Sequence, residues 1–186
     1  MDAARRILDN AGLRHIRIER VAGDLTDHYS PKEQVLRLSD TTIHSESIAA
    51  IGVAAHECGP ALQHANSYAP LTIRNTIVPV VNLGSRLSWP MILIGLLLGI
   101  TGFLDAGIVL FSFSLIFQLI TLPVEFNASS RALQILDDTN MLYDDELRGA
   151  KKVLSAAAMT YVAAAIATLL SLLRLIILFG GRRRND

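Results

Sequence analysis

Three long stretches of the chain are almost free of charge, and they constrain the fold more than any other feature. Residues 87–104 and 106–124 hold no charged side chain, and residues 153–173 form a third such run that continues beyond Arg174. A helix needs about 20 apolar residues to cross the hydrocarbon layer of a membrane. The runs therefore predict three membrane spans, at about 87–104, 106–124 and 153–179. Buried helices of a soluble protein are the alternative, but such helices normally keep a polar stripe.

Only Asp105 separates the first two runs, so we expect it to lie in a tight turn that makes them an antiparallel hairpin. A hairpin returns the chain to the side of the membrane from which it left. The segments before the first span and after the second therefore lie on one face of the bilayer. Those segments carry His56 and Glu125, and we predict that these two side chains come together there.

The residues ahead of the spans predict a short helix and a small β-ribbon. Ile7 and Leu8 belong to an apolar pattern with helical spacing, whereas Ile16 and Ile18 alternate with polar neighbours as strand residues do. A second strand is expected at Val35 to Leu38. Between them, Tyr29-Ser30-Pro31 predicts a loop.

The stretch AAHECGPALQHA, Ala54 to Ala65, lies on a helix predicted at about 45–66, which Ser45 or Ser47 would cap. Zinc hydrolases use H-E-x-x-H on a helix, because histidines four residues apart lie on one face and can hold one ion. The glutamate beside the first histidine serves as general base, and a third protein ligand comes from elsewhere in the chain. A His-Glu pair alone is common by chance, so this signal is weak by itself.

Several stretches give the pair a context. They are LTDHYSP (Leu25 to Pro31), SIAAIGVAAHECGPALQHA (Ser47 to Ala65), YAPL (Tyr68 to Leu71), LPVEFNASSRAL (Leu122 to Leu133) and MTYVAAA (Met159 to Ala165). Together they cover most of the chain in the right order. On these stretches the sequence resembles the YugP-like family of membrane-associated bacterial zinc metallopeptidases, a neutral zinc metallopeptidase family with a gluzincin-like site.

The resemblance implies a Zn²⁺ centre in which His56 and Glu125 are metal ligands and Glu57 is the general base. Ser129 follows Glu125 by four residues, so it faces the same way and is expected to support the ligands from behind. Gln63 either forms a hydrogen bond near the site or lies on the surface. The residue types thus match the family at every position except one.

The exception is Pro60, which stands where the family has its second histidine ligand. Proline has no metal-binding atom and no backbone N–H, and inside a helix it costs about 3 kcal/mol and introduces a kink. His28 or His64 could replace the missing ligand, although both are more simply surface or structural residues. Cys58 lies on the apolar stripe of the helix, which favours packing over metal binding.

The predicted fold is mainly α and membrane-integral, with an N-terminal α/β-ribbon element and a zincin-like active-site helix. A membrane-associated catalytic part is expected over residues 1–76 and a membrane region over 77–186. The membrane region contains the hairpin, one C-terminal span and a third-ligand helix at about 123–136.

Two functions fit these observations. The first is a zinc-dependent endopeptidase that hydrolyses a peptide or membrane-protein substrate lying along Val35 to Leu38, impaired here by Pro60. The second is a non-catalytic membrane scaffold or polypeptide-binding quality-control protein. Lysine plus arginine and aspartate plus glutamate balance at 17 each, so no net charge points to nucleic acid.

The expected location is the bacterial inner membrane, with several spans and a cytoplasmic active site. The basic residues that would fix the orientation lie on both sides, since Arg182–Arg184 follow the last span while Lys151 and Lys152 precede it. The resemblance also implies a further membrane helix ahead of Ala3, which we expect to be absent here.

Overall fold

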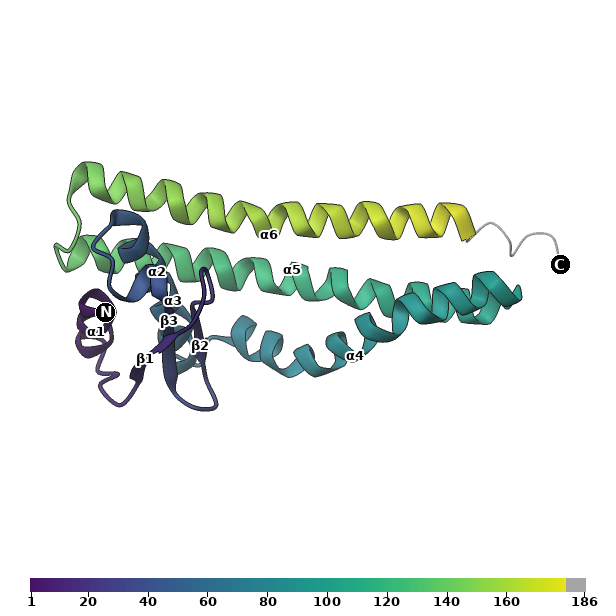
Figure 1. Ribbon diagram of the computed structural model, residues 1–186, viewed down its shortest axis with the longest axis horizontal. Helices are drawn as coiled ribbons and strands as arrows, with labels where there is room; N and C mark the ends of the chain where they lie inside the picture. The colour runs from purple at the N-terminus through teal and green to yellow at the C-terminus, as the bar shows by residue number, and fades with distance from the viewer. Residues whose placement is uncertain (180–186) are drawn as a thin grey trace. The chain divides into compact units, whose positions relative to one another are not determined.

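The computed structural model describes residues 1–179 (Figure 1). In chain order the elements are α1 (Asp2–Asn10), β1 (Arg17–Val21), β2 (His28–Ser30), β3 (Val35–Ser39), α2 (Asp40–Ile43), α3 (Ile48–Ala65), α4 (Ala69–Leu98), α5 (Thr101–Asp138) and α6 (Asp144–Phe179). The predicted mainly α fold with a small N-terminal sheet is confirmed. The basic run Arg182–Arg184 lies outside the described residues.

The chain divides into two units. The first unit comprises Met1–Thr72 and Pro123–Met159, and the second comprises Ile73–Leu122 and the chain from Thr160 onward. The helices α4, α5 and α6 each have residues in both units. Helix α5 continues beyond residue 124, where the sequence predicts the end of the second span, although the boundary between the units falls at Pro123.

The sheet of the first unit has three strands in the order β1–β3–β2 (Figure 1). Strand β3 pairs in parallel with β1 and antiparallel with β2, so Ile18 and Tyr29 are both register partners of Leu36. The loop expected at Tyr29-Ser30-Pro31 is wrong for its first two residues, because His28–Ser30 pairs with β3. A three-residue strand has too few positions to show alternation in the sequence.

The order of the strands also decides where a bound peptide could pair with the sheet. Strand β3 is central, so both of its edges already carry ladder hydrogen bonds. A substrate that lies near Val35 to Leu38 could therefore not pair with β3 itself. The outer edges of the sheet belong to β1 and β2.

An apolar core joins α1, the sheet, α3 and those parts of α5 and α6 that belong to the first unit. Its fully buried members include Ile7, Leu36 and Cys58. On α3, Ala55 and Leu62 are buried as well, which confirms that Cys58 lies on an apolar stripe. Each fully buried Leu or Ile side chain contributes about 1.5–3 kcal/mol relative to the exposed state. This core holds α3 in place from one side.

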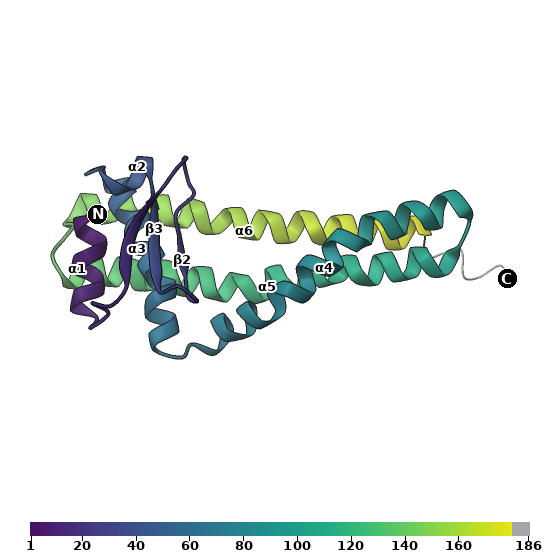
Figure 2. The same ribbon diagram turned by 60° about the horizontal axis from the view of Figure 1, so that its bottom comes forward.

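Three helices, α4, α5 and α6, are long and apolar enough to cross a membrane, as the sequence predicts. The first two are joined at Gly99 and Ile100 (Figure 2), and Gly99 has a φ of +69°, which glycine adopts without steric cost. The prediction that Asp105 lies in the turn is wrong, because Asp105 lies within α5.

Small and polar residues join the helices of the second unit. The Oγ atoms of Ser85 and Ser114 are 2.7 Å apart. The Nε2 of Gln118 donates to Thr168 Oγ1 at 2.8 Å. A Cβ atom on Gly107 would lie 2.6 Å from a side-chain carbon of Ile92, so α4 and α5 approach too closely for a larger residue. Such contacts are typical of helix association in lipid, where burial of apolar surface gives no driving force.

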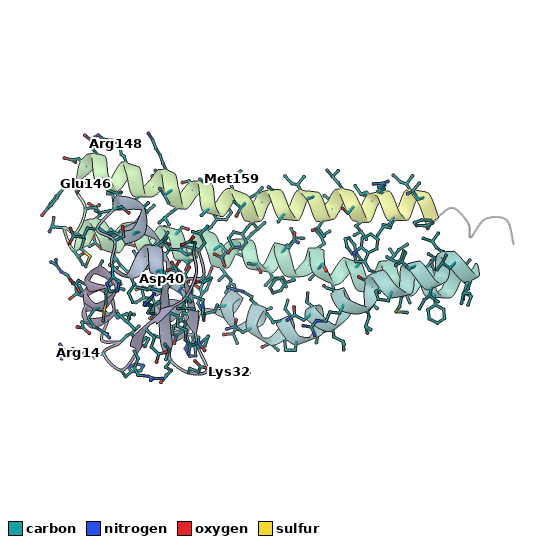
Figure 3. All side chains as sticks on the ribbon, viewed as in Figure 1. Arg14, Lys32, Asp40, Glu146, Arg148 and Met159 are labelled. Atoms are coloured by element: carbon teal, nitrogen blue, oxygen red, sulfur yellow. The ribbon has the colours of Figure 1, made fainter. Side chains whose placement is uncertain are left out.

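Charged side chains gather on the first unit. Those labelled in Figure 3 all belong to it: Arg14, Lys32, Asp40, Glu146 and Arg148. In the second unit the described charged residues are only Arg74, Arg86, Asp105 and Arg174. Its apolar side chains are instead widely exposed, and Leu97 and Ile177 reach 84% and 77%. This surface is suited to lipid.

Candidate metal centre

The motif helix α3 starts at a side-chain cap and ends after the motif. The hydroxyl of Ser47 accepts a hydrogen bond from the backbone N–H of Ala50 at 3.2 Å. This satisfies one of the N–H groups that the first turn of a helix leaves without a partner. The helix then continues through Pro60 to Ala65. The local sequence therefore still forms the motif helix despite the proline.

His56 on α3 meets two residues of α5. Its Nε2 lies 3.2 Å from Glu125 Oε2, a contact between residues 69 apart in the sequence. Its Nδ1 lies 3.1 Å from Ser129 Oγ. The side chains of His56 and Glu125 are 16% and 8% exposed. The predicted convergence of His56, Glu125 and Ser129 is therefore present in the structure, within the first unit.

The spacing of the two inner atoms suits a metal ion. Two ligand atoms that each lie about 2.1 Å from a tetrahedral zinc are roughly 3.4 Å apart. The 3.2 Å between His56 Nε2 and Glu125 Oε2 is close to that value. Meanwhile Ser129 occupies the outer ring nitrogen, which is the usual way in which a metal-binding histidine is oriented. These residues fit two protein ligands of a zinc centre and a group behind one of them.

The third ligand position does not fit. Catalytic zinc sites normally have three protein ligands. Pro60, one helical turn after His56, offers no donor atom. Among residues 1–179, no group of three His, Cys, Asp or Glu side chains is arranged to hold a metal ion. The donor set of this chain is therefore one ligand short of a catalytic zinc centre.

The two histidines considered as substitutes do not lie beside His56. His64 contacts Tyr29, and His28 lies on the same strand as Tyr29. His64 is exposed, and its Nδ1 is 3.3 Å from the Tyr29 hydroxyl. His28 is also exposed, and its Nδ1 is 2.8 Å from the carbonyl oxygen of Thr26. Partial burial raises the pKa of Tyr29 above its usual range. Neither histidine joins His56 and Glu125 in a group of three.

Gln63 is fully buried between α3 and α5, which decides against the surface alternative. Its Nε2 donates to the carbonyl oxygen of Val124 at 3.0 Å and to Asn127 Oδ1 at 3.0 Å. Asn127 also accepts from Arg131 Nε at 2.8 Å. The sequence does not mark Asn127 as part of this contact, because side chains two residues apart on a helix do not face each other.

Glu57 and Cys58 lie beside His56 in the sequence but differ in their surroundings. Glu57 is partly exposed, as a base that must reach solvent or substrate would be. Cys58 is completely buried in the core. Burial, together with the nearby charge of Glu57, raises the pKa of the Cys58 thiol far above its usual range. Cys58 is therefore a packing residue, as its place on the apolar stripe predicts.

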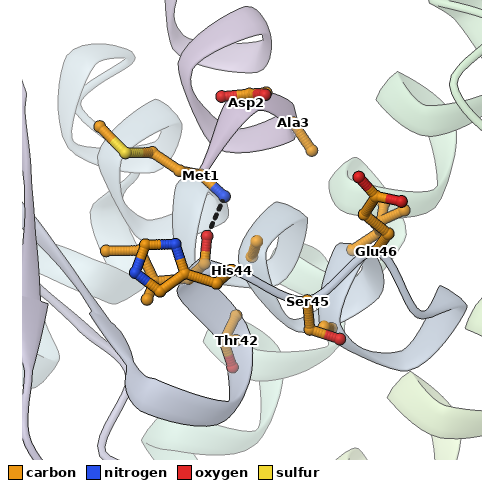
Figure 4. Close-up of a pocket in the computed structure, with 11 residues that line it drawn as sticks. Met1, Asp2, Ala3, Thr42, His44, Ser45 and Glu46 are labelled. Carbon is orange, nitrogen blue, oxygen red and sulfur yellow. Dashed lines mark hydrogen bonds between the residues drawn. The ribbon is translucent and has the colours of Figure 1, made fainter.

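Two cavities lie in the first unit. One, of about 560 Å³, lies between α5 and α6 and includes Ser129 in its lining. The rest of its lining is mixed in character: Phe126, Ser130, Leu133, Gln134, Asp137, Leu147, Lys151 and Ser155. The other, of about 370 Å³, lies where α1 meets the start of α3, and the Met1 amino group donates to the Ile43 carbonyl oxygen at its edge (Figure 4). Of these two cavities, the first adjoins the candidate centre through Ser129.

Comparisons with known proteins agree with this geometry. Residues 1–180 match the model of a family described as "Putative neutral zinc metallopeptidase". The chain belongs to this family. It is also 51% identical over 185 residues to "Putative membrane protease YugP" of Bacillus subtilis strain 168, a match that covers 99% of this chain and 82% of that protein. No solved structure matches the chain.

Membership of the neutral zinc metallopeptidase family confirms the resemblance that the motifs carry. The family is described as a putative zinc metallopeptidase family, and the three apolar helices of the chain suit a membrane protein. In this member, His56 and Glu125 come together across α3 and α5, and Pro60 lies within the helix that carries His56.

Proposed function

We propose that this protein is a membrane-embedded endopeptidase of the zinc metallopeptidase family whose centre is impaired at Pro60. One observation carries the proposal: His56 Nε2 and Glu125 Oε2 lie 3.2 Å apart although they come from distant helices. Ser129 lies at the other ring nitrogen of the imidazole, so the three side chains form one arrangement. It is the arrangement that two ligands of one metal ion require.

Each residue has a role that its position supports. His56 and Glu125 hold the metal, and Ser129 fixes which ring nitrogen of His56 points inward. Glu57, partly exposed beside His56, is the proton acceptor. Zinc bound by a complete donor set would supply Lewis-acid activation of water for attack on a peptide carbonyl. Because one donor is missing, we expect hydrolysis by the chain as it stands to be very slow.

The substrate class that we propose is an extended polypeptide, including segments of membrane proteins. The cavity between α5 and α6 starts at Ser129, so side chains next to a cleaved bond have room of about 560 Å³ beyond the centre. Its mixed lining suits polypeptide rather than a purely apolar ligand. Strand β2 offers an outer sheet edge, and Tyr29 on this strand contacts His64 of α3. A peptide that pairs with β2 would lie near the motif helix.

The proposed location is the bacterial inner membrane, crossed by α4, α5 and α6, with the centre on the cytoplasmic face. Support comes from the length and composition of these helices and from the concentration of charge in the first unit. Lys151 and Lys152, in the first unit, favour a cytoplasmic face by the positive-inside rule.

The test restores the missing donor. The Pro60→His variant, purified and placed in liposomes, should take up one zinc ion per chain and cleave a disordered polypeptide such as β-casein. Cleavage should stop on addition of 1,10-phenanthroline and should be absent from the double variant Pro60→His/Glu57→Gln. The control for the double variant is its zinc content, which should match that of Pro60→His because Glu57 is not a ligand.

The outcomes separate the alternatives. Zinc uptake and chelator-sensitive cleavage by Pro60→His, with neither in the unmodified chain, would support the proposal. A folded Pro60→His variant that takes up no zinc would refute it. Full activity in the unmodified chain would refute the impairment at Pro60.

A non-catalytic role in binding polypeptides is the second candidate, and the absence of a donor at Pro60 is the observation that favours it. A photoreactive residue introduced at Gln134, in the lining of the 560 Å³ cavity, should then crosslink intact β-casein in the unmodified chain. Unlabelled casein should compete, and the same probe at exposed Arg14, which lies outside that lining, should give no crosslink. Equal crosslinking at both positions would contradict this role.

A further inference from the structure

A cavity in the second unit combines apolar walls with a single cation. It lies between α4 and α6 and has a volume of about 310 Å³. Its lining is apolar except for Ser171 and Arg174 of α6. Small-molecule sites have volumes of about 300–1,000 Å³, so this cavity has room for part of a ligand, such as a length of hydrocarbon chain.

Packing within the second unit holds the walls of this cavity in place. Ile92 and Leu175 belong both to its lining and to a buried apolar cluster, in which they are 1% and 8% exposed. Trp89 of α4 also lines the cavity, and its ring meets Phe111 edge-on with the ring centroids 6.3 Å apart. This contact with α5 orients an indole that is otherwise half exposed. The cavity is therefore built by three helices of one unit.

Arg174 has no protein partner within residues 1–179. Its side chain is exposed and takes part in neither an ion pair nor a hydrogen bond with these residues. Asp105 is the one acidic residue in the described part of the second unit, and it does not line the cavity. Hydrocarbon offers no counter-charge, so a cation on a membrane helix needs a partner from outside the helix.

The position of Arg174 along α6 indicates where that partner comes from. Arg174 lies five residues before Phe179, which is about 7.5 Å along a helix. Arginine side chains near the end of a membrane helix reach toward the lipid head groups. The guanidinium therefore lies close to phosphate groups, while the apolar walls of the cavity run beside it.

We propose that this cavity binds one anionic phospholipid of the surrounding bilayer. The lipid phosphate accepts hydrogen bonds from the Arg174 guanidinium, whose planar fork matches two phosphate oxygens. One acyl chain lies against Ile92 and Leu175, and the indole of Trp89 lies at the level of the lipid ester groups, where tryptophan is enriched. The inference is independent of the metal centre and needs only that α4 and α6 lie in a bilayer.

The composition of the cavity selects this class of ligand against two others. A soluble anion would pair with Arg174 but would leave the apolar walls uncovered. A zwitterionic lipid carries a cation of its own beside its phosphate, which weakens the attraction to the guanidinium. An anionic lipid matches both the charge and the apolar surface.

Trp89 makes the proposal measurable, because it is the only tryptophan in the chain. The full chain is reconstituted in phosphatidylcholine bilayers that contain a small fraction of phosphatidylglycerol with brominated acyl chains. A second set contains the same fraction of brominated phosphatidylcholine. Bromine quenches tryptophan fluorescence on contact, so the dependence of quenching on lipid fraction gives a binding constant for each lipid. Their ratio is the preference for the anionic lipid.

The unmodified chain should prefer phosphatidylglycerol, and Arg174→Gln should lower this preference about fivefold, the effect of one basic side chain at an anionic membrane surface. Arg174→Lys keeps the charge but not the planar fork, so its loss should be smaller. The basic run Arg182–Arg184 is present in every variant, so its general attraction for anionic lipid cancels in the comparison.

Two further variants separate the cavity from the charge. Arg86→Gln removes an equal charge from α4, three residues before Trp89 and outside the lining, so the preference should stay unchanged. Ser171→Phe keeps Arg174 and fills the cavity, so the preference should fall as far as in Arg174→Gln. Both positions are exposed, and an unchanged thermal midpoint checks that each variant is folded.

Each result supports or overturns the proposal. Equal quenching of the unmodified chain by the two lipids would overturn it. Equal losses for Arg86→Gln and Arg174→Gln would show that the charge of the helices alone attracts the lipid. An undiminished preference in Ser171→Phe would show that the acyl chain lies outside the cavity. Relief of quenching by inorganic phosphate, beyond that by sodium chloride at equal ionic strength, would assign Arg174 to a soluble anion instead.

Discussion

The two faces of α3 have different roles: one packs in the apolar core, and the other makes polar contacts with α5. The core face carries Ala55, Cys58 and Leu62, which are buried in the apolar core of the first unit. The site face carries His56 and Gln63, whose polar atoms contact α5. On the core face, size and apolarity suffice, so several residue types would serve. On the site face, position 60 is a proline, which offers no donor atom, although the helix still forms.

The comparison is least clear at Gly59, which adjoins both faces. A Cβ atom there would lie 2.8 Å from the Cβ and 2.9 Å from the Cα of Ala128 on α5. Real Cβ atoms are not found that close to a backbone, so α3 and α5 must separate if the glycine is replaced. The close approach at Gly59 is therefore a condition for His56 to reach Glu125.

The largest effect is expected for Gly59→Leu. Overpacking of a close-packed interior typically costs 1–3 kcal/mol, and we expect about 3 kcal/mol here because the nearest atoms belong to backbone. The measurement is the thermal midpoint in detergent, read with a maleimide dye that fluoresces on reaction with Cys58, the single cysteine. In the Pro60→His background the same substitution should also abolish metal uptake.

The control is Gly12→Leu, because a Cβ atom at Gly12 meets no atom within 4 Å. Gly12 has a positive φ, so we expect this substitution to cause a smaller loss of stability and to leave metal uptake unchanged. Intact metal uptake in folded Gly59→Leu would show that the two faces do not share this contact.

The second effect concerns Cys58 itself. Thiol reagents attack the thiolate, and burial raises the pKa of this thiol, so the folded protein should react slowly at pH 8. We expect labelling by 5,5′-dithiobis(2-nitrobenzoic acid) to be at least about 100-fold slower in native than in urea-unfolded protein, in line with inert buried cysteines. The matched control is the exposed Ser130→Cys in a Cys58→Ala background, which should react at the rate of the unfolded chain. Fast labelling of native Cys58 would show that this residue is not buried on the core face.

The third prediction tests the site face alone. Ser129→Ala in the Pro60→His background removes the hydroxyl at His56 Nδ1, and cobalt affinity should fall about tenfold, the lower end expected for a group behind a ligand. The thermal midpoint should change little, because the hydroxyl packs in no apolar cluster. Ser130→Ala, one residue further and exposed, is the control and should leave affinity unchanged. An equal loss for both serines would mean that Ser129 acts through α5 as a whole and not through His56.

The sequence predicts the site face best where a motif and a topological argument coincide. The His-Glu pair points to the imidazole, and the hairpin brings Glu125 to the same side, so His56, Glu125 and Ser129 could be placed together before any coordinates. The core face is equally predictable, because helical spacing alone selects Ala55, Cys58 and Leu62.

The features that the sequence does not predict depend on distant partners. Strand β2 has three residues and forms because β3 offers an edge, so its own residues look like a loop. The contact of Gln63 with Asn127 joins residues 64 apart in the sequence, and neither residue type predicts this contact. The sequence does not predict the turn at Gly99, because the charged Asp105 is the stronger turn signal within an apolar run.

The smallest effect is expected at the start of α3, which belongs to neither face. Ser47 caps the helix nine residues before His56, and loss of such a cap costs about 1 kcal/mol. Ser47→Ala should therefore lower the thermal midpoint slightly, while cobalt affinity in the Pro60→His background stays the same, because the core face still fixes the later turns of α3. Ser47→Asp keeps a side-chain acceptor at the cap, so it should leave the midpoint near that of the parent. If Ser47→Ala weakened cobalt binding as much as Ser129→Ala, the position of His56 would depend on the whole helix rather than on its contacts with α5, and the distinction between the two faces would not hold.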